Sequence, residues 1–172
     1  MLGYLTAALR LAALGGVAAI TVSAQPALAT DSTGSLSVNA TITSNCAVST
    51  TTVAFGNIDV TLNTTVDATG AISVTCTNGV AWTAKANAGT GGAGTSLTHR
   101  KMTGTGKMSY DLYTDAARTT KWGDGVTSGT ATFAGTGTGS AQGQTVYGRV
   151  RNGQTGVTAG NYSDTVTVTV TY

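Results

Sequence analysis

A strict two-residue alternation near the C-terminus constrains the fold more than any other feature of this sequence. Val166, Val168, Val170 and Tyr172 alternate with threonines at positions 165, 167, 169 and 171. This period is typical of a β-strand with one face on an apolar core and the other in water. Because no turn follows Tyr172, we expect the far edge of this strand to pair with a distant segment or with another molecule.

A second segment near the other end of the chain has the same period. Leu36, Val38, Ala40 and Ile42 alternate with polar residues across positions 35–43. β-Branched residues fit the pleated surface of a strand, and the apolar face of this segment also requires a partner. We therefore expect the two segments to be complementary halves of one intermolecular contact.

Residues 1–29 have the pattern of a secretory signal peptide. Arg10 is their only charge, an apolar run covers residues 11–22, and residues 27–29 form an A-x-A cleavage site. The run is too short for a comfortable membrane span. We predict export, cleavage after Ala29 with Ala24 as the alternative, and no stable membrane insertion of the mature chain.

The composition of the remaining chain favours an all-β domain with many loops. Charged residues make up 9% of the whole sequence, glutamate does not occur, glycine occurs 24 times, and the single proline lies in the predicted signal peptide. The basic residues are scattered and the net charge is +2, which argues against nucleic-acid binding. So few charges also give weak protection against association at strand edges.

The two cysteines, Cys46 and Cys76, both follow the predicted signal peptide. In an exported chain such a pair predicts one disulfide. A metal site is the alternative, but His99 is the only histidine and no C-x-x-C spacing occurs.

Turn residues divide the chain into seven or eight expected strands, as in a β-sandwich. Asn78-Gly79 predicts a type I′ hairpin. The expected strands cover residues 47–59 (with a turn at Gly56-Asn57), 71–77, 80–87, 108–113, 130–133, 145–151 and the final segment, and a glycine-rich loop is expected at 88–96.

The sequence offers no recognisable catalytic site, and we expect no enzyme, cofactor or bound metal. His99 lies in a glycine-flanked stretch without a G-x-S-x-G motif, and aspartates 111, 115, 124 and 164 have neighbours that favour turn roles. Tyr110, Tyr113, Trp122 and Tyr147 have the aromatic character of a carbohydrate-binding platform, although their strand-like spacing favours core packing.

Several motifs together resemble the spore coat protein U domain family, including pilin subunits of archaic, Csu-type chaperone-usher pili. They are Asn45-Cys46-Ala47-Val48, Phe55-Gly56, residues 72–76, residues 110–119, Trp122-Gly123, Tyr147-Gly148 and Gly160-Asn161-Tyr162-Ser163-Asp164-Thr165. The resemblance covers essentially the whole mature chain.

This resemblance implies an immunoglobulin-like β-sandwich that lacks its last strand and is completed by a donor strand from another subunit. Residues 30–44 would be the donor extension, with Leu36, Val38, Ala40 and Ile42 as its plugs, and residues 45–172 the domain. Val166, Val168, Val170 and Tyr172 would form the acceptor edge, and Cys46 and Cys76 match the family's disulfide.

The implied function is that of a structural subunit of a surface fibre, acting in adhesion and biofilm formation. Its partners would be copies or homologous pilins joined head to tail, a periplasmic chaperone and an outer-membrane usher, and its route would lead through the periplasm to the cell surface. The alternative is a self-closed secreted β-sandwich, either a coat protein or a carbohydrate-binding module. The sequence leaves open whether this is a major or minor subunit, whether it serves a pilus or a coat, and which surface is bound.

Overall fold

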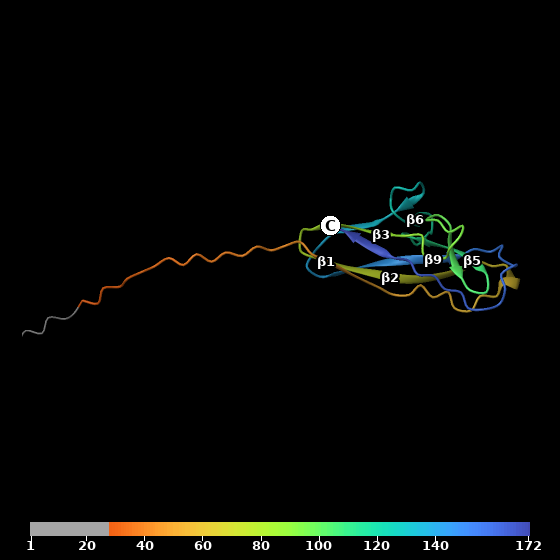
Figure 1. Cartoon of the computed structure of the whole chain (residues 1–172), viewed down its shortest axis with the longest axis horizontal. Coiled ribbons are helices and arrows are strands. Elements are labelled where there is room, and N and C mark those ends of the chain that lie inside the picture. The colour runs from red at the N-terminus through yellow and green to blue at the C-terminus, as the bar shows by residue number, and fades with distance from the viewer. Residues whose placement is uncertain (1–27) are drawn as a thin grey trace, which may run out of the picture. The chain divides into compact units, whose positions relative to one another are not determined.

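The computed structural model describes residues 28–172, which form ten strands and one short 3-10 helix (Figure 1). The predicted signal peptide therefore lies almost entirely outside the described residues. The chain divides into two units between Asn39 and Ala40, and all ten strands belong to the second. The expectation of an all-β fold with two sheets is confirmed. No helix among residues 28–172 is long and apolar enough to cross a membrane.

The larger sheet has seven strands in the order β1-β2-β9-β5-β6-β7, with β4 paired to β5. Their bounds are β1 Cys46–Thr50, β2 Val66–Cys76, β4 Arg100–Thr103, β5 Lys107–Tyr113, β6 Lys121–Trp122, β7 Thr130–Ala131 and β9 Ala141–Val150. The antiparallel pair of β2 and β9 is its longest ladder and joins ten residue pairs, from Val66 with Val150 to Thr75 with Ala141. β5 lies beside β9, as Figure 1 shows.

The smaller sheet has three antiparallel strands in the order β10-β3-β8, with β3 Ala81–Ala86, β8 Phe133–Thr136 and β10 Val168–Thr171. Val168 lies opposite Ala86 and Val170 opposite Ala84. The valines of this segment are partly buried and its threonines are exposed, as the alternation predicts. Regular pairing begins only at Val168, two residues after the first valine of the pattern.

The core lies between the two sheets and is rich in aromatic side chains. The ring centroids of Trp122 and Phe133 are 5.1 Å apart in an edge-to-face arrangement. Each buried tryptophan N–H has an acceptor: Trp122 donates to the carbonyl of Ala84, and Trp82 donates to the side chain of Gln142. These two bonds run from one sheet to the other and fix how the layers face each other.

The predicted hairpin at Asn78-Gly79 is wrong, although the turn itself exists. The Val80 amide donates to the Thr77 carbonyl, and Gly79 has a positive φ of 81°. However, β2 pairs with β1 and β9, whereas β3 pairs with β8 and β10. The turn therefore carries the chain from one sheet to the other, and Gly79 donates to the Gly137 carbonyl beside β8.

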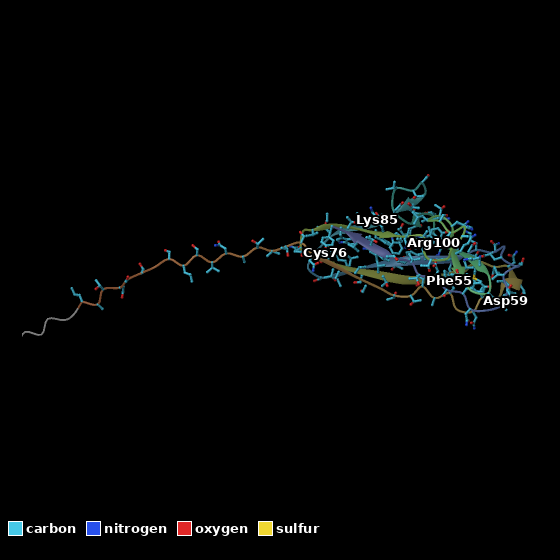
Figure 2. The ribbon with its side chains drawn as sticks, in the orientation of Figure 1. Phe55, Asp59, Cys76, Lys85 and Arg100 are labelled. Carbon is cyan, nitrogen blue, oxygen red and sulfur yellow. A yellow bond between two sulfur atoms is a disulfide. The ribbon has the colours of Figure 1, made fainter. Side chains whose placement is uncertain are left out.

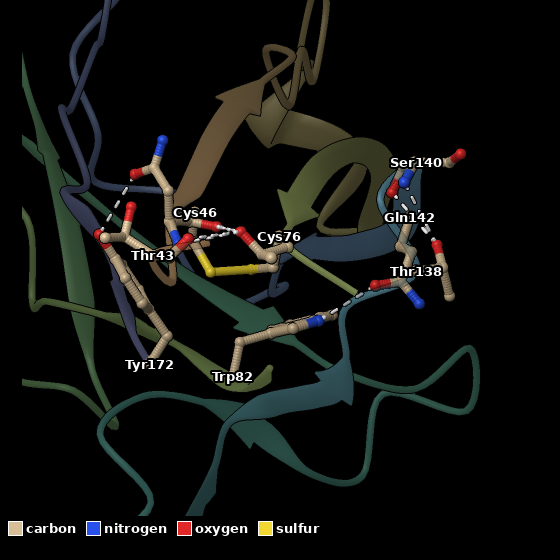
Figure 3. Close-up of a disulfide and its surroundings, with 10 residues drawn as sticks. Thr43, Cys46, Cys76, Trp82, Thr138, Ser140, Gln142 and Tyr172 are labelled. Atoms are coloured by element: carbon tan, nitrogen blue, oxygen red, sulfur yellow. Dashed lines mark hydrogen bonds between the residues drawn. A yellow bond between two sulfur atoms is a disulfide. The ribbon is translucent and has the colours of Figure 1, made fainter. Parts of the chain in front are cut away.

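The disulfide between Cys46 and Cys76 is present and joins the first residue of β1 to the last residue of β2 (Figure 3). The two cysteines are also directly opposite each other in the β1–β2 ladder. Cys76 is buried next to the core, whereas Cys46 is only partly covered. The covalent bond thus fixes the residue at which the segment 28–45 meets the sheet.

Candidate functional site

An open cleft of about 1080 Å³ with an apolar floor lies in the second unit. Residues 50–60 form one wall, and residues 157–166 together with Val168 form the other. Its floor is made of core side chains from the larger sheet: Met102, Met108, Tyr110, Leu112, Trp122 and Val146. A concave site with an apolar floor and polar groups along its walls is typical of a binding site.

The first wall is a stretch of backbone that leaves the larger sheet. The Thr51 amide donates to the Ala71 carbonyl at 2.8 Å, and beyond it the backbone of 52–59 makes no hydrogen bond with another described segment. The strand predicted for residues 47–59 therefore ends at Thr50. Figure 2 labels Phe55 and Asp59, which lie along this wall.

Two glycines of the larger sheet explain why this segment departs. A Cβ atom on Gly70 would lie 2.7 Å from Val53, and one on Gly148 would lie 2.6 Å from Val53 and 2.8 Å from Phe55. Val53 and Phe55 therefore occupy the space that side chains on β2 and β9 would fill. Because Val53 and Phe55 pack on the inner face of the larger sheet, the backbone of residues 52–59 does not hydrogen-bond with the edge of that sheet.

The second wall presents the free edge of the segment that ends in β10. The Thr167 carbonyl accepts a hydrogen bond from the Asn87 amide, which directs the Thr167 backbone toward β3. Because these directions alternate along an antiparallel strand, Val166 and Val168 direct their N–H and C=O groups away from β3, toward the cleft. Among residues 28–172, β10 pairs with β3 alone.

The two walls thus expose facing rows of unpaired backbone groups above an apolar floor. Buried backbone groups without partners are unfavourable, and free strand edges are templates for pairing with another chain. The arrangement therefore has what an extended peptide requires: hydrogen-bonding groups on either side and an apolar floor for alternate side chains.

Asp164 is the main polar group of the cleft wall. Its carboxylate accepts hydrogen bonds from the Tyr110 hydroxyl at 2.6 Å and from the amides of Thr90 and Thr165 at 2.7 and 2.8 Å. Burial, together with the bond to Asp164, raises the pKa of Tyr110. The carboxylate therefore joins the floor strand β5, the loop after β3 and the wall.

Tyr162 anchors the same wall two residues earlier. Its hydroxyl donates to the Thr158 carbonyl at 2.7 Å and lies 3.0 Å from Thr105 Oγ1, while Ser163 exchanges two backbone bonds with Thr103 at the end of β4. The tyrosine and aspartate of the Gly-Asn-Tyr-Ser-Asp motif therefore hold the wall in place.

The structure places the predicted acceptor residues at two different positions. Val166 and Val168 line the cleft, whereas Val170 and Tyr172 do not. Tyr172 lies near β1 instead, with its hydroxyl 3.5 Å from Asn45 Oδ1 (Figure 3). The floor residues and the Val53–Phe55 wall were not predicted from the sequence as parts of a site.

The predicted donor residues are exposed, and residues 28–45 belong to no strand. The exposed fractions are 88% for Leu36, 84% for Val38 and 86% for Ile42, and Ala40 is exposed as well. Leucine, valine and isoleucine side chains are normally among the most buried in a protein. An alternating row of them in water is therefore an unpartnered apolar face.

The four aromatic residues considered as a ligand platform do not share a surface. Tyr110 and Trp122 are buried against the cleft floor. Tyr113 is also buried, with its hydroxyl 3.3 Å from Asp111, and Tyr147 lies under the guanidinium of Arg118. His99 is exposed and lies 3.3 Å from Ser109 Oγ. These contacts favour packing over ligand binding.

The spore coat protein U domain model matches residues 32–169, which is most of the sequence. The chain belongs to the spore coat protein U domain family. No curated protein matches this chain. Among solved structures, it is similar to a chain of the chaperone–tip adhesion subunit pre-assembly complex from archaic chaperone-usher Csu pili of Acinetobacter baumannii, at 18% identity and a TM-score of 0.58. The match covers 77% of this spore coat protein U domain protein and 40% of the other chain. At 18% identity, the likeness shows the fold alone.

Proposed function

We propose that this protein is a structural subunit of an exported fibre of the archaic chaperone-usher type. In this proposal, residues 35–43 of one copy, or of a homologous subunit, enter the cleft of another and complete its smaller sheet. The observation that carries the proposal is that one chain contains two complementary features, each without a partner among the described residues. One is the apolar cleft with unpaired backbone along its walls, and the other is an exposed strand-like segment with four apolar residues at every second position.

The physical basis is β-augmentation, in which main-chain hydrogen bonds supply affinity and alternate side chains fill pockets. Full burial of a leucine-, isoleucine- or valine-sized side chain contributes about 1.5–3 kcal/mol, so Leu36, Val38 and Ile42 together favour a long-lived joint. A slip by one residue would turn serine and threonine onto the floor. The contact is head to tail and does not close on itself, so its product is a filament.

The domain organisation follows from this mechanism. Residues 1–29 would be removed on export, residues 30–44 would serve as the donor extension, and residues 45–172 would form the accepting domain. Before assembly the cleft would be an aggregation hazard, because it joins apolar surface to free strand edges. A periplasmic chaperone that fills the cleft temporarily, and an outer-membrane usher at which the donor segment replaces it, would meet this need. The assembled fibre would lie at the cell surface and act in adhesion and biofilm formation.

Electrophoresis of the exported full-length protein, co-expressed with its candidate chaperone and usher, tests this proposal. Unboiled samples should show a ladder of multimers that boiling collapses to one band. Deletion of residues 31–43 should remove the ladder. A monomer band in both samples, from a soluble and stable protein, would instead indicate a self-closed coat or carbohydrate-binding domain.

Point variants make the test specific for the apolar face of the donor segment. Val38→Asp or Ile42→Asp should abolish the ladder and leave the chaperone complex intact, because the chaperone engages the cleft rather than the donor segment. Ser37→Asp is the matched control, since by the period of two it faces away from the floor. Filaments of normal length from Val38→Asp would contradict the donor assignment.

A further inference from the structure

The cleft offers four successive inward-facing positions along the wall that leads into β10. They are Val168, Val166, Asp164 and Tyr162, all of which line the cleft and are partly buried. Their backbone spacing is two residues, the same as that of the apolar residues in 35–43. Four donor side chains therefore meet four wall positions, and the question is which donor residue lies at which position.

The position at Asp164 differs from the others because a side chain of the floor forms a hydrogen bond with the wall there. The Tyr110 side chain comes from β5 on the floor, and its hydroxyl reaches Asp164 on the wall at 2.6 Å. The Phe55 ring from the opposite wall packs edge-on against Tyr110, with ring centroids 6.3 Å apart. Side chains from the floor and both walls therefore converge near Asp164, and this reduces the room for a donor side chain at that position.

One of the four apolar residues of the donor segment is much smaller than the other three. Leu36, Val38 and Ile42 are large, whereas Ala40 is small. A large side chain placed over Tyr110 would have to displace its ring and break the bond to Asp164, which holds the Thr90 and Thr165 amides as well. The small residue and the shallow position are complementary in size.

We propose that the Tyr110–Asp164 pair sets the register of the joint by admitting only Ala40. This inference rests on the proposed function and adds to it the direction and alignment of the donor strand. The donor runs antiparallel to β10, with Leu36 opposite Val168, Val38 opposite Val166, Ala40 opposite Asp164 and Ile42 opposite Tyr162.

Three alternative alignments place a large side chain over Tyr110. A parallel donor filling the same four positions puts Val38 opposite Asp164. An antiparallel donor displaced by two residues puts Val38 or Ile42 there. Because a two-residue slip keeps the apolar face inward, alternation alone does not exclude it, and a size filter is needed to fix the alignment.

The test uses the full-length protein assembled with chaperone and usher, and measures how fast multimers dissociate on heating in detergent. The variant Val38→Ala/Ala40→Val moves the small residue by one inward position without changing composition. Overpacking of this kind should make dissociation about ten- to a hundredfold faster. The control Leu36→Val/Val38→Leu keeps Ala40 in place and should dissociate at nearly the wild-type rate.

A second substitution at Tyr110 on the floor distinguishes a change of register from a general loss of packing in the joint. Tyr110→Leu removes the ring and the hydroxyl and should restore slow dissociation to the Val38→Ala/Ala40→Val joint, while giving the control no comparable slowing. Equal dissociation rates for the two exchanged variants, or no slowing of the Val38→Ala/Ala40→Val joint by Tyr110→Leu, would overturn the register. A wild-type protein that forms no ladder would instead contradict the proposed function, on which this inference rests.

A crosslinking measurement covers the case in which Tyr110→Leu fails to fold. A photoreactive diazirine side chain at position 42 leaves Tyr110 intact. The proposed alignment expects crosslinks to Tyr162, Met102 or Met108 of the accepting copy, since Ser163 is paired to Thr103 at that end of the cleft. Crosslinks to Val168 or Val170 would place the donor in the opposite direction and overturn the inference.

Discussion

The guanidinium of Arg100 donates to the Asn87 carbonyl from both Nε, at 3.0 Å, and Nη2, at 2.8 Å. Asn87 in turn exchanges bonds with the wall of the cleft, because its amide donates to the Thr167 carbonyl and its Oδ1 accepts from the Thr167 amide. Arg100 is 0% exposed, and its remaining bonds go to the carbonyls of Trp122 and Leu97. A buried cation thus joins β4 to β6 and, through Asn87, to Thr167 at the C-terminal end of the second wall.

Replacement of Arg100 by Met should destabilise the domain by about 2–4 kcal/mol, because buried carbonyls of Asn87, Leu97 and Trp122 lose their donors. Urea unfolding of the full-length protein measures this loss. Lys101→Met on the same strand is the control and should change stability by less than about 0.5 kcal/mol. Similar unfolding midpoints for both variants would show that the Arg100 bonds contribute little.

Gly148→Ala should destabilise the domain and disturb the first wall of the cleft. Its Cβ would lie 2.6 Å from Val53 and 2.8 Å from Phe55, and overpacking of this kind costs about 1–3 kcal/mol. Gly143→Ala lies on the same strand, meets nothing within 4 Å and serves as the matched control. Thermal unfolding of both variants checks this. A Gly148→Ala protein as stable as Gly143→Ala would mean that the segment 51–59 is not seated on Gly148.

The disulfide should contribute about 3–4 kcal/mol, because it closes a loop of 30 residues in the unfolded chain. The double variant Cys46→Ser/Cys76→Ser should therefore unfold at a lower urea concentration than the oxidised wild type. Addition of a reductant to the wild type should reproduce the shift and leave the double variant unchanged. A wild-type midpoint that is insensitive to full reduction would contradict this.

Stability should fall in acid, and Asp124 should be one cause. Hydrogen bonds from the Thr127 and Val126 amides hold the pKa of Asp124 below its ordinary value. A carboxylate whose pKa is lower in the folded state stabilises the fold above the unfolded pKa of about 3.9, and this contribution is lost as the pH falls through the folded value. Asp124→Asn should therefore lower the urea midpoint at pH 7 and have a smaller effect at pH 3. An equal effect at both values would exclude this linkage.

Short-range signals in the sequence predicted local structure well. The valine–threonine alternation correctly predicted the exposed and covered faces around β10, and the cysteine pair is joined. The Asn78-Gly79 turn also exists, but its strands pair elsewhere because Gly79 and Val80 bond with Gly137 beside β8. Pairing partners of a strand depend on tertiary contacts that a dipeptide does not encode.

The strand β4 was missed for a related reason. Its first residue is Arg100, and a charged residue next to a glycine-rich stretch favours an exposed loop. The structure instead buries Arg100 by giving its guanidinium carbonyl acceptors from three separate segments. The cleft was likewise invisible in the sequence, because it arises where Val53 and Phe55 leave the sheet to pack on two glycines.

If the donor segment joins subunits, the disulfide lies on the path that carries tension along the fibre. A pull on residues 35–43 reaches the domain at Cys46, the first residue of the edge strand β1. The covalent bond passes the load directly to Cys76 at the end of β2, whose ladder with β9 joins ten residue pairs. The short strand β1 need not be peeled away one hydrogen bond at a time. The force is instead shared along the longest ladder of the domain.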